Sequence, residues 1–356
     1  MTGTLQATMP DTIAIGVARA VRFVADMFTR AGLPPAASLE LAEALVDADR
    51  SGLPSHGLSQ AEMYLRRLAL GSVSTAEEPL VIDSRGATAV LDARGMFGHL
   101  AGRRAMQMAI DRSKTFGVGV VAVRNSFHFG AAGRYAQQAS DHDCIGLAMC
   151  NTKPMMPAPG GLTKLVGNNP LAIGLPTAEG PDFLLDMALS KAALGKIRTY
   201  EKAGRALPDG WAVDTDGRPT TDPTAAIAGM LLPAGGAKGF GLALAIDLMC
   251  SLLAEGPGGD DVAPLYGDLT KPFMCSLLFI AIDIAHFRTT SDFRIEADDA
   301  LSRIRAAPAT TGPLRTPGER GWASRNGSDT IHIPAPLAAT LDKMAAACGS
   351  AVRLHD

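Results

Sequence analysis

The spacing of apolar residues predicts a helical start to the chain. In residues 11–31 and 36–50, apolar positions recur every three or four residues, which predicts two helices, with Ser38 as the expected cap of the second. The stretch "SGLPSHGLS" interrupts this pattern with glycine and proline, and a further helix is expected near residues 60–70. His56 therefore lies in a turn between two expected helices.

Shorter apolar runs predict strands, and the chain as a whole has the pattern of an α/β protein. The run "GVGVVAV" at residues 117–123 is typical of a strand buried on both faces. The other expected strands are residues 79–83, 87–92, 144–150, 171–175, 182–186 and 275–283. The other expected helices are residues 97–115, 130–140, 239–254, 292–306 and 336–347. Three long stretches are expected to be loops, at residues 202–224, 256–272 and 307–330.

Charge and composition narrow the class of protein. The 356 residues carry 33 basic and 36 acidic side chains, so neither nucleic acid nor an anionic membrane is expected as the main partner. The five cysteines form no CxxC pair, which favours buried thiols over disulfides or a zinc site. The most apolar run, residues 275–285, is too short for a membrane span. The first residues, "MTGTLQATMPDT", lack the features of a signal peptide, so we expect a cytoplasmic protein.

Two histidines lie at positions that suit chemistry. His128 follows the strand at residues 117–123 and precedes an expected helix, whose N-terminal N–H groups favour a phosphate or a carboxylate. The alternative is that His128 packs in the core with its two phenylalanine neighbours. His56 has a hydroxyl neighbour, Ser55, and an imidazole suits proton donation to an oxygen or nitrogen undergoing reduction. The alternative is a turn histidine bonded to its own backbone.

Three further stretches admit both a functional and a structural interpretation. In "GGAKGFG" at residues 235–241, Lys238 and the glycines form either an anion cradle or the close-packed entry to a buried helix. Asp186 ends a strand and either accepts ribose hydroxyls or caps the segment that follows. In "RTPGERG", Arg315 and Arg320 either clamp a phosphate or belong to a solvated loop. No GxGxxG closes a strand, so a Rossmann nucleotide site is not predicted.

Taken in order, these motifs resemble the type 2 malate/L-lactate dehydrogenase family. The matching stretches cover nearly the whole chain and are SHG at 55, NSFHFGAAG at 125, GNNPLAIGLP at 167, DMALS at 186, GKI at 195, GWAVDTDGRPTTDP at 210, GGAKGFGLAL at 235 and PGER at 317. The resemblance implies a non-Rossmann α/β fold, with a largely antiparallel cofactor-domain sheet flanked by helices and a helical N-terminal region.

The resemblance also implies a division of the chain into four parts. Residues 1–80 would form the N-terminal helical part of a substrate and dimerisation domain, and residues 81–120 a crossover with a helix. Residues 121–290 would bind NAD(P), and residues 291–356 would return to the first domain.

Finally, the resemblance implies a reaction and the residues that perform it. Family members are homodimers that reduce 2-oxo acids, or cyclic 2-imino acids, with NADH or NADPH. By resemblance, His56 is the proton donor, Ser55 its relay neighbour and Lys196 a further catalytic residue. The residues expected to contact the substrate are Gln60, His128, Asn168, Leu194 and Gly195. Those expected to contact the cofactor are His128, Phe129, Gly130, Ala131, Ala132, Asp186, Met187, Ala188, Gly236, Ala237, Lys238, Gly318, Glu319 and Arg320, and no metal is expected.

The chain departs from the family pattern at two substrate positions. Gln60 stands where most members have a carboxylate-binding arginine, and Leu194 where an arginine or histidine is usual. Either Lys153, Lys196 or Arg134 binds the carboxylate instead, or the substrate is larger and less acidic than malate. Lys196 stands where cyclic imino acid reductases carry an aspartate, which favours a 2-oxo acid over Δ1-pyrroline-2-carboxylate or Δ1-piperideine-2-carboxylate.

A third hypothesis is a cofactor-binding homologue that has lost catalysis. The presence of Ser55, His56, His128 and Asp186 in one chain argues against such a loss.

Overall fold

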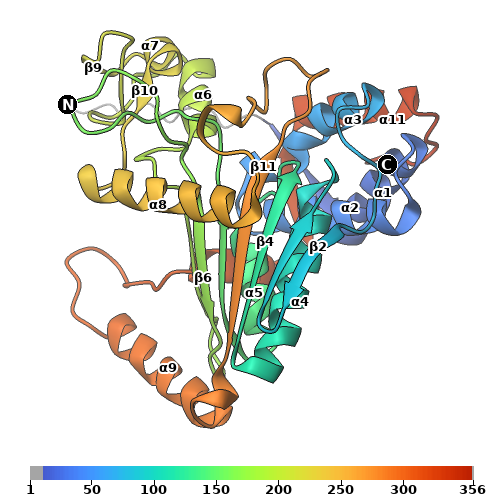
Figure 1. The fold of residues 1–356 in the computed structure, drawn as a ribbon. Helices are drawn as coiled ribbons and strands as arrows, with labels where there is room; N and C mark the ends of the chain where they lie inside the picture. Colours follow the sequence, from blue (N-terminus) through green and yellow to red (C-terminus); the bar gives the residue numbers. More distant parts are fainter. Residues whose placement is uncertain (1–10, 355–356) are drawn as a thin grey trace. The chain divides into compact units, whose positions relative to one another are not determined.

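A computed structural model describes residues 11–354, which divide into two compact units (Figure 1). The first unit comprises the described residues up to Ala69 together with those from Arg320 onward, and the second comprises Leu70–Glu319. Residues 1–10, which carry most of the stretch considered above for a signal peptide, lie outside the described part.

The first unit is mainly helical. Its helices are α1 (Val17–Arg30), α2 (Pro35–Arg50), α3 (Ala61–Ala69) and α11 (Ala335–Ala347), and α10 (Glu319–Asn326) begins at its boundary. The helices α1 and α2 pack together through fully buried side chains that include Phe23, Met27, Leu41 and Leu45. This burial of one face of each helix is the usual source of helix stability in a protein.

The start of the chain corrects two expectations. Strand β1 (Thr12–Gly16) pairs antiparallel with β12 (Thr330–Pro334), so the helix expected over residues 11–31 begins only at Val17. The alternation of β-branched residues in "TIAIG" fits a strand, and its apolar positions also fit the helical spacing that follows. Ser38 is not a helix cap: α2 begins at Pro35, and the Ser38 hydroxyl donates to the carbonyl of Leu33 (3.1 Å).

The second unit is built on a seven-stranded sheet of order β2-β3-β4-β11-β5-β6-β7. The strands are β2 (Leu80–Arg85), β3 (Thr88–Asp92), β4 (Val118–Ser126), β5 (Cys144–Cys150), β6 (Leu171–Leu175), β7 (Phe183–Met187) and β11 (Cys275–Asp283). All neighbouring strands are antiparallel except β3 and β4, which are parallel. The expectation of a largely antiparallel sheet is therefore confirmed.

Helices cover both faces of this sheet (Figure 1). On one face lie α4 (Gly98–Phe116) and α5 (Gly133–Ser140), and the Tyr135 ring of α5 meets the Phe279 ring of β11 edge to face at 5.2 Å. On the other face lies α8 (Ala237–Ala254), which shares a core cluster with Leu278 of β11. Neighbouring residues of a strand point to opposite faces, so Leu278 and Phe279 fill two separate layers.

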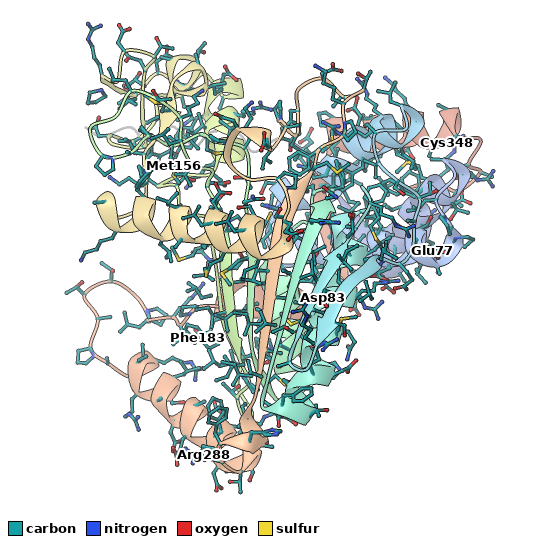
Figure 2. All side chains as sticks on the ribbon, in the orientation of Figure 1. Glu77, Asp83, Met156, Phe183, Arg288 and Cys348 are labelled. Carbon is teal, nitrogen blue, oxygen red and sulfur yellow. The ribbon has the colours of Figure 1, made fainter. Side chains whose placement is uncertain are left out.

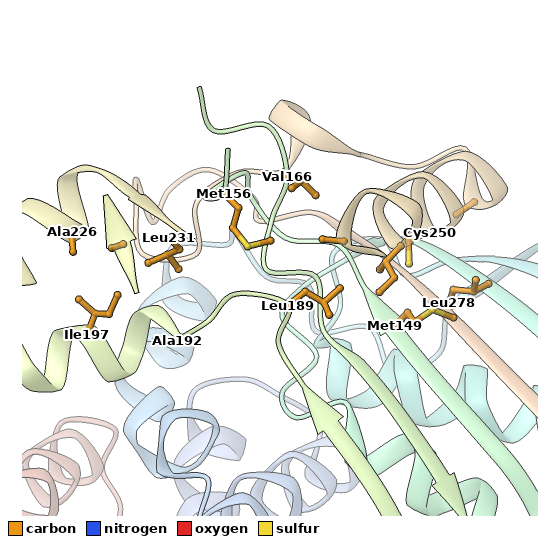
Figure 3. Packing of buried hydrophobic residues seen from close by; sticks show 14 of the residues in the cluster. Met149, Met156, Val166, Leu189, Ala192, Ile197, Ala226, Leu231, Cys250 and Leu278 are labelled. Atoms are coloured by element: carbon orange, nitrogen blue, oxygen red, sulfur yellow. The ribbon is translucent and has the colours of Figure 1, made fainter. Parts of the chain in front are cut away.

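A smaller part of the second unit adjoins the α8 side of the sheet. It contains α6 (Leu194–Lys202), α7 (Pro223–Ala228) and a three-stranded sheet of order β10-β8-β9, and its strands are β8 (Ala212–Val213), β9 (Pro219–Thr220) and β10 (Met230–Leu231). Its core, drawn in Figure 3, includes Met156, Leu189, Ile197 and Leu231. Figure 2 shows Met156 among the side chains of this part, beside α8.

The expected loops contain more structure than their composition predicts. The stretch 202–224 holds β8 and β9, and 256–272 contains a single 3-10 turn at Gly259–Asp261. The stretch 307–330 contains α10, and α9 (Thr290–Arg305) precedes it. The expected buried thiols are confirmed for Cys144, Cys150, Cys250 and Cys275, whereas Cys348, labelled in Figure 2, is partly exposed.

Candidate active site

His56 lies in a tight turn of the first unit. The chain leaves α2, forms two 3-10 turns at Pro54–His56 and Leu58–Gln60, and enters α3. The Ser55 hydroxyl and Nδ1 of His56 are hydrogen-bonded at 3.0 Å, so the imidazole is oriented by its neighbour. Ser55 is exposed and the His56 ring is half-buried. Burial lowers the pKa of His56, which favours the neutral ring near pH 7.

Gln60 lies inside the same turn. Only 5% of its surface is exposed, and its Nε2 donates a hydrogen bond to the carbonyl oxygen of Ser55 (2.6 Å). The position at which the resemblance implies a substrate-binding arginine is thus occupied by a buried amide bonded to the turn itself.

In the second unit, the segment after β4 answers the question of whether His128 packs in the core. The rings of Phe127 and Phe129 are buried, and Phe127 meets Phe97 and Phe273 edge to face at 5.6 and 5.8 Å. His128, between them, is only half-buried. The two phenylalanines therefore anchor the segment in the core, as the structural alternative expected, while the imidazole itself is not fully enclosed.

Asp186 caps a helix, although not the segment that follows it. Its Oδ2 accepts a hydrogen bond from the backbone N–H of Gly133 (2.8 Å), the first residue of α5. A Cβ atom at Gly133 would lie 2.9 Å from this oxygen, so only glycine fits there without displacement. Protein atoms around the carboxyl group raise the pKa of Asp186, although the residue as a whole remains exposed.

The end of β7 is the meeting point of several distant segments. The N–H of Leu184 donates to the carbonyl of Pro317 (3.1 Å). Just past the strand, the N–H of Leu189 donates to the carbonyl of Asn168 (2.7 Å), and the N–H of Ala234 donates to the carbonyl of Leu189 (2.8 Å). Together with the Asp186 contact to α5, these bonds bring together four of the sequence motifs and Ala234, the residue that precedes a fifth, in the second unit.

The approach of residues 317–318 to β7 depends on a glycine. Gly318 has a φ of +97°, a conformation that L side chains rarely adopt. A Cβ atom at this position would lie 2.9 Å from the carbonyl oxygen of Asp182. Glu319, next in the chain, accepts hydrogen bonds from Arg305 and Thr316 at 2.5 Å each. Burial raises the pKa of Glu319, but the hydrogen bonds with Thr316 and Arg305 and the positive charge of Arg305 together lower the pKa below its ordinary value.

The two glycines before α8 have open space where a side chain would lie. Gly235 and Gly236 have φ values of +69° and +62°, and no atom lies within 4 Å of a Cβ built on either. Ala237 and the exposed Lys238 begin the helix. Open glycines, unpaired helix N–H groups and a lysine form an arrangement that fits a phosphate group.

Asn168 is held between two chain segments. Its Oδ1 accepts a hydrogen bond from the Thr152 hydroxyl (2.8 Å). Thr152 is followed in the chain by the exposed Lys153. The adjacent Asn169 is fully buried and donates to the carbonyl of Ala243 in α8 (2.8 Å). Asn169 is therefore structural, and it fixes the loop from which the half-buried Asn168 extends.

The GKI motif forms the start of α6, a helix that periodicity did not predict. Leu194 is its first residue and is half-buried, while Gly195 and Lys196 are exposed. The Lys196 ammonium lies 4.8 Å from the centroid of the Trp211 ring, a cation–π geometry. The structure thus places an aromatic partner, from the "GWAVD" motif, beside the proposed catalytic lysine.

One residue of the His56 turn escaped the sequence interpretation. Asp49, at the end of α2, accepts a hydrogen bond from the N–H of Leu58 (2.7 Å) through Oδ2. Burial raises the pKa of Asp49 to about 7, against the opposing effect of this hydrogen bond. The only signal in the sequence is a carboxylate at the end of the helix that precedes SHG. Among residues 11–354, no group of three or more potential metal ligands is arranged to hold a metal ion.

Comparison with known proteins places the chain among enzymes. Residues 15–342 match the family model described as malate/L-lactate dehydrogenase. L-sulfolactate dehydrogenase of Methanocaldococcus jannaschii is 37% identical over 302 residues, which cover 84% of this chain and 86% of that protein. Ureidoglycolate dehydrogenase (NAD(+)) of Escherichia coli O157:H7 is 34% identical over 292 residues, with 82% and 83% covered.

Solved structures agree with the sequence comparison. The sulfolactate dehydrogenase of M. jannaschii superposes with a TM-score of 0.89, covering 96% of this chain and 98% of that one, at 33% identity. The Δ1-piperideine-2-carboxylate reductase of Pseudomonas syringae pvar. tomato gives 0.85, with 93% and 99% covered, at 28% identity. The chain therefore belongs to the malate/L-lactate dehydrogenase family and is an NAD(P)-dependent oxidoreductase that acts on CH–OH groups.

Proposed function

We propose that this protein reversibly reduces a 2-oxo acid to a 2-hydroxy acid with NAD(P)H, and that His56 donates the proton. The observation that supports this most directly is the bonded pair of Ser55 and His56 in an ordered turn. A positioned imidazole acid of this kind contributes about 10²- to 10⁴-fold in rate.

The hydrogen bond between Ser55 and His56 suggests the path of the transferred proton. A neutral ring with its proton on Nε2 donates that proton to the substrate oxygen as the oxygen gains electrons. The Ser55 hydroxyl, hydrogen-bonded to Nδ1, replaces the proton, and its exposure allows solvent to restore it. The lowered pKa of His56 suits this relay, because the ring returns to its neutral form. In the reverse direction the same ring accepts the proton.

The second unit would hold the cofactor. Bound nicotinamide supplies the hydride that reduces C2 of the substrate. Among this chain's residues, the segment from His128 to Ala132 and the strand end from Asp186 to Ala188 would face it, and Asp186 would accept ribose hydroxyls while still capping α5. The open turn from Gly236 to Lys238 would bind phosphate. By resemblance, Gly318, Glu319 and Arg320 would also contact the cofactor.

The substrate contacts differ from the family pattern. We propose that His128, Asn168, Leu194 and Gly195 line the substrate site, with Lys196 as a second catalytic cation oriented by Trp211. Because a leucine stands where the resemblance implies a cation at the start of α6, we favour a 2-oxo acid that is larger and carries less negative charge than a small dicarboxylate such as oxaloacetate.

A substrate panel tests the proposal. Purified protein is mixed with NADH or NADPH and with a series of 2-oxo acids, from pyruvate and oxaloacetate to larger ones, and the loss of reduced nicotinamide absorbance is followed. Turnover of a 2-oxo acid with either cofactor is expected. Turnover of Δ1-piperideine-2-carboxylate alone would assign the protein to imine reduction, and binding of cofactor with no turnover of any compound would contradict catalysis.

We further infer that the enzyme is a cytoplasmic homodimer paired through α8. Among the described helices, only α8 is long and apolar enough, at 18 residues, to meet the criteria for a membrane span. Its residues Ala243, Ile246 and Cys250 nevertheless pack against the sheet, as in a core helix. Its outer side exposes Leu248, Leu252 and related apolar side chains, a patch that usually marks a protein interface. Light scattering should give twice the chain mass, and Leu252→Glu should halve it.

A further inference from the structure

The turn that carries His56 is held on one side by the carboxylate of Asp49. Its Oδ2 accepts from the N–H of Leu58, two residues after the histidine, at 2.7 Å. A Cβ atom at Gly57 would lie 2.3 Å from the same oxygen and 2.6 Å from Oδ1. The carboxyl group therefore lies directly against the backbone of the residue that follows His56, and the absence of a side chain there permits this close contact.

On the other side, Gln60 holds the residue that precedes the histidine. The Gln60 side chain folds back by five residues, and its amide donates to the carbonyl oxygen of Ser55 at 2.6 Å. The residue is 5% exposed, so water competes little for this hydrogen bond. Asp49 and Gln60 thus fix the backbone after and before His56, respectively.

We propose that Asp49 and Gln60 are positioning residues that hold the turn carrying the His56 imidazole. Gln60 therefore orients the proton donor instead of binding the substrate carboxylate. This inference rests on the proposed role of His56 as proton donor. A misplacement of about 1 Å at a reacting group can cost about 100-fold in rate. The two side chains act on the backbone at Ser55 and Leu58, which sets the direction of the ring.

The clamp at Asp49 depends on an oxygen acceptor and not on a negative charge. Burial raises the pKa of Asp49 to about 7, so both the neutral and the ionised carboxyl group occur near neutral pH. Each form retains an oxygen that accepts from the Leu58 N–H. Asparagine, which has the same shape and one carbonyl oxygen, should therefore replace aspartate with little loss, whereas leucine should not.

The first test compares Asp49→Leu with Asp49→Asn in the full-length enzyme. Asp49→Leu should lower kcat about tenfold or more, while the Kd for NAD(P)H stays within about twofold of wild type. Asp49→Asn should keep kcat within about threefold, because it preserves the acceptor. Glu43→Gln, a change of charge at an exposed position of the same helix, is the matched control and should leave both quantities unchanged.

The second test uses Gln60, whose two alternative roles predict opposite results. Gln60→Met keeps the length of the side chain and removes the donor, so kcat should fall about tenfold at unchanged KM for the 2-oxo acid. Gln60→Arg, the residue usual in the family, should also lower kcat. If Gln60→Arg instead lowers KM and preserves kcat, the side chain at position 60 faces the substrate and the proposal is wrong.

A double-mutant cycle checks that the close contact matters. Gly57→Ala should lower kcat because its Cβ overlaps the Asp49 carboxyl group. In the Asp49→Ala background, the same change should cost at least about threefold less, since the overlapping atoms are gone. Equal costs in both backgrounds would contradict the contact.

The controls separate this inference from the proposed function. If His56→Ala leaves turnover intact, the proton-donor role fails and the clamp has nothing to position. If His56→Ala abolishes turnover but folded Asp49→Leu and Gln60→Met retain wild-type kcat, only the clamp is wrong. Circular dichroism and thermal melting of each variant exclude unfolding as the cause of any loss.

Discussion

The two parts of the proposed catalytic machinery are built in opposite ways. In the first unit, the His56 turn is held by residues from one continuous stretch, Asp49 to Gln60. In the second unit, the end of β7 is held by α5, by the Asn168 loop and by Ala234 and Pro317, which are far apart in the sequence.

This difference has consequences for function. A turn held by its own neighbours can keep its geometry while the rest of the chain moves, which suits a group that must transfer a proton at a fixed distance. A meeting point of distant segments forms only when the whole sheet is folded, and it creates a broad surface of backbone groups, which suits a large dinucleotide. We therefore expect changes in the turn to affect kcat, and changes at the end of β7 to affect cofactor affinity.

The largest expected effect concerns stability and comes from the buried carboxyl group of the turn. The folded pKa of Asp49, about 7, lies above the unfolded value of 3.8, so the folded state binds more protons between these values. Stability contributed by the neutral carboxyl is complete below pH 4 and is lost as pH rises to 7, by up to roughly 4 kcal/mol.

Denaturant unfolding of wild type and Asp49→Asn between pH 4 and 8 measures this effect. The difference in the free energy of unfolding should shift in favour of the variant as pH rises. The lowered pKa of His56 is common to both proteins, so its contribution cancels in the difference. A difference that does not vary with pH would mean that Asp49 titrates normally.

A smaller effect is expected at the glycine that lets the 317–318 segment approach β7. Gly318→Ala places a Cβ 2.9 Å from the Asp182 carbonyl in a left-handed conformation, and should lower the free energy of unfolding by about 2 to 3 kcal/mol. Cofactor affinity should fall with it, while kcat at saturating cofactor should stay near wild type. Gly312→Ala, at a position that also has a positive φ (+62°) but no atom within 4 Å of a built Cβ, is the control and should cost about 1 kcal/mol.

The smallest stability effect is expected at the cap of α5. Asp186→Ala removes the acceptor for the Gly133 N–H and should cost about 1 kcal/mol of stability. If Asp186 also binds ribose, the Kd for NAD(P)H measured by fluorescence titration should rise about tenfold. Asp186→Asn keeps the cap and serves as the comparison. A cofactor Kd that does not change in Asp186→Ala would leave this residue a purely structural role.

Strands were predicted more accurately from the sequence when they lie in the interior of the large sheet, because burial makes them continuous apolar runs. The strands at residues 144–150, 171–175 and 275–283 begin and end where the apolar runs do, because all three are interior strands of one sheet. Strand β1 was missed because the strand with which it pairs, β12, comes from the other end of the chain. The helix α6 was missed because it is short and carries a glycine in its first turn.

The candidate site was predictable in its motifs but not in its contacts. The sequence identified His56, His128 and Asp186, and the family resemblance assigned their roles. One of the two interpretations of Asp186 was a cap of the segment after it, whereas the helix that it caps begins at Gly133, more than 50 residues earlier in the chain. Likewise, a glutamine in place of arginine indicated a missing contact, but only the structure shows that its amide bonds to Ser55.

The measurement that tests the central claim most directly is a comparison of His56→Ala with wild type, using the substrate found in the panel. Turnover gives kcat at saturating cofactor, and fluorescence titration gives the Kd for NAD(P)H. With His56 as the proton donor, we predict that kcat falls at least about 100-fold while Kd changes less than about twofold. Unchanged kcat, or an equal loss of turnover and of cofactor binding, would contradict it.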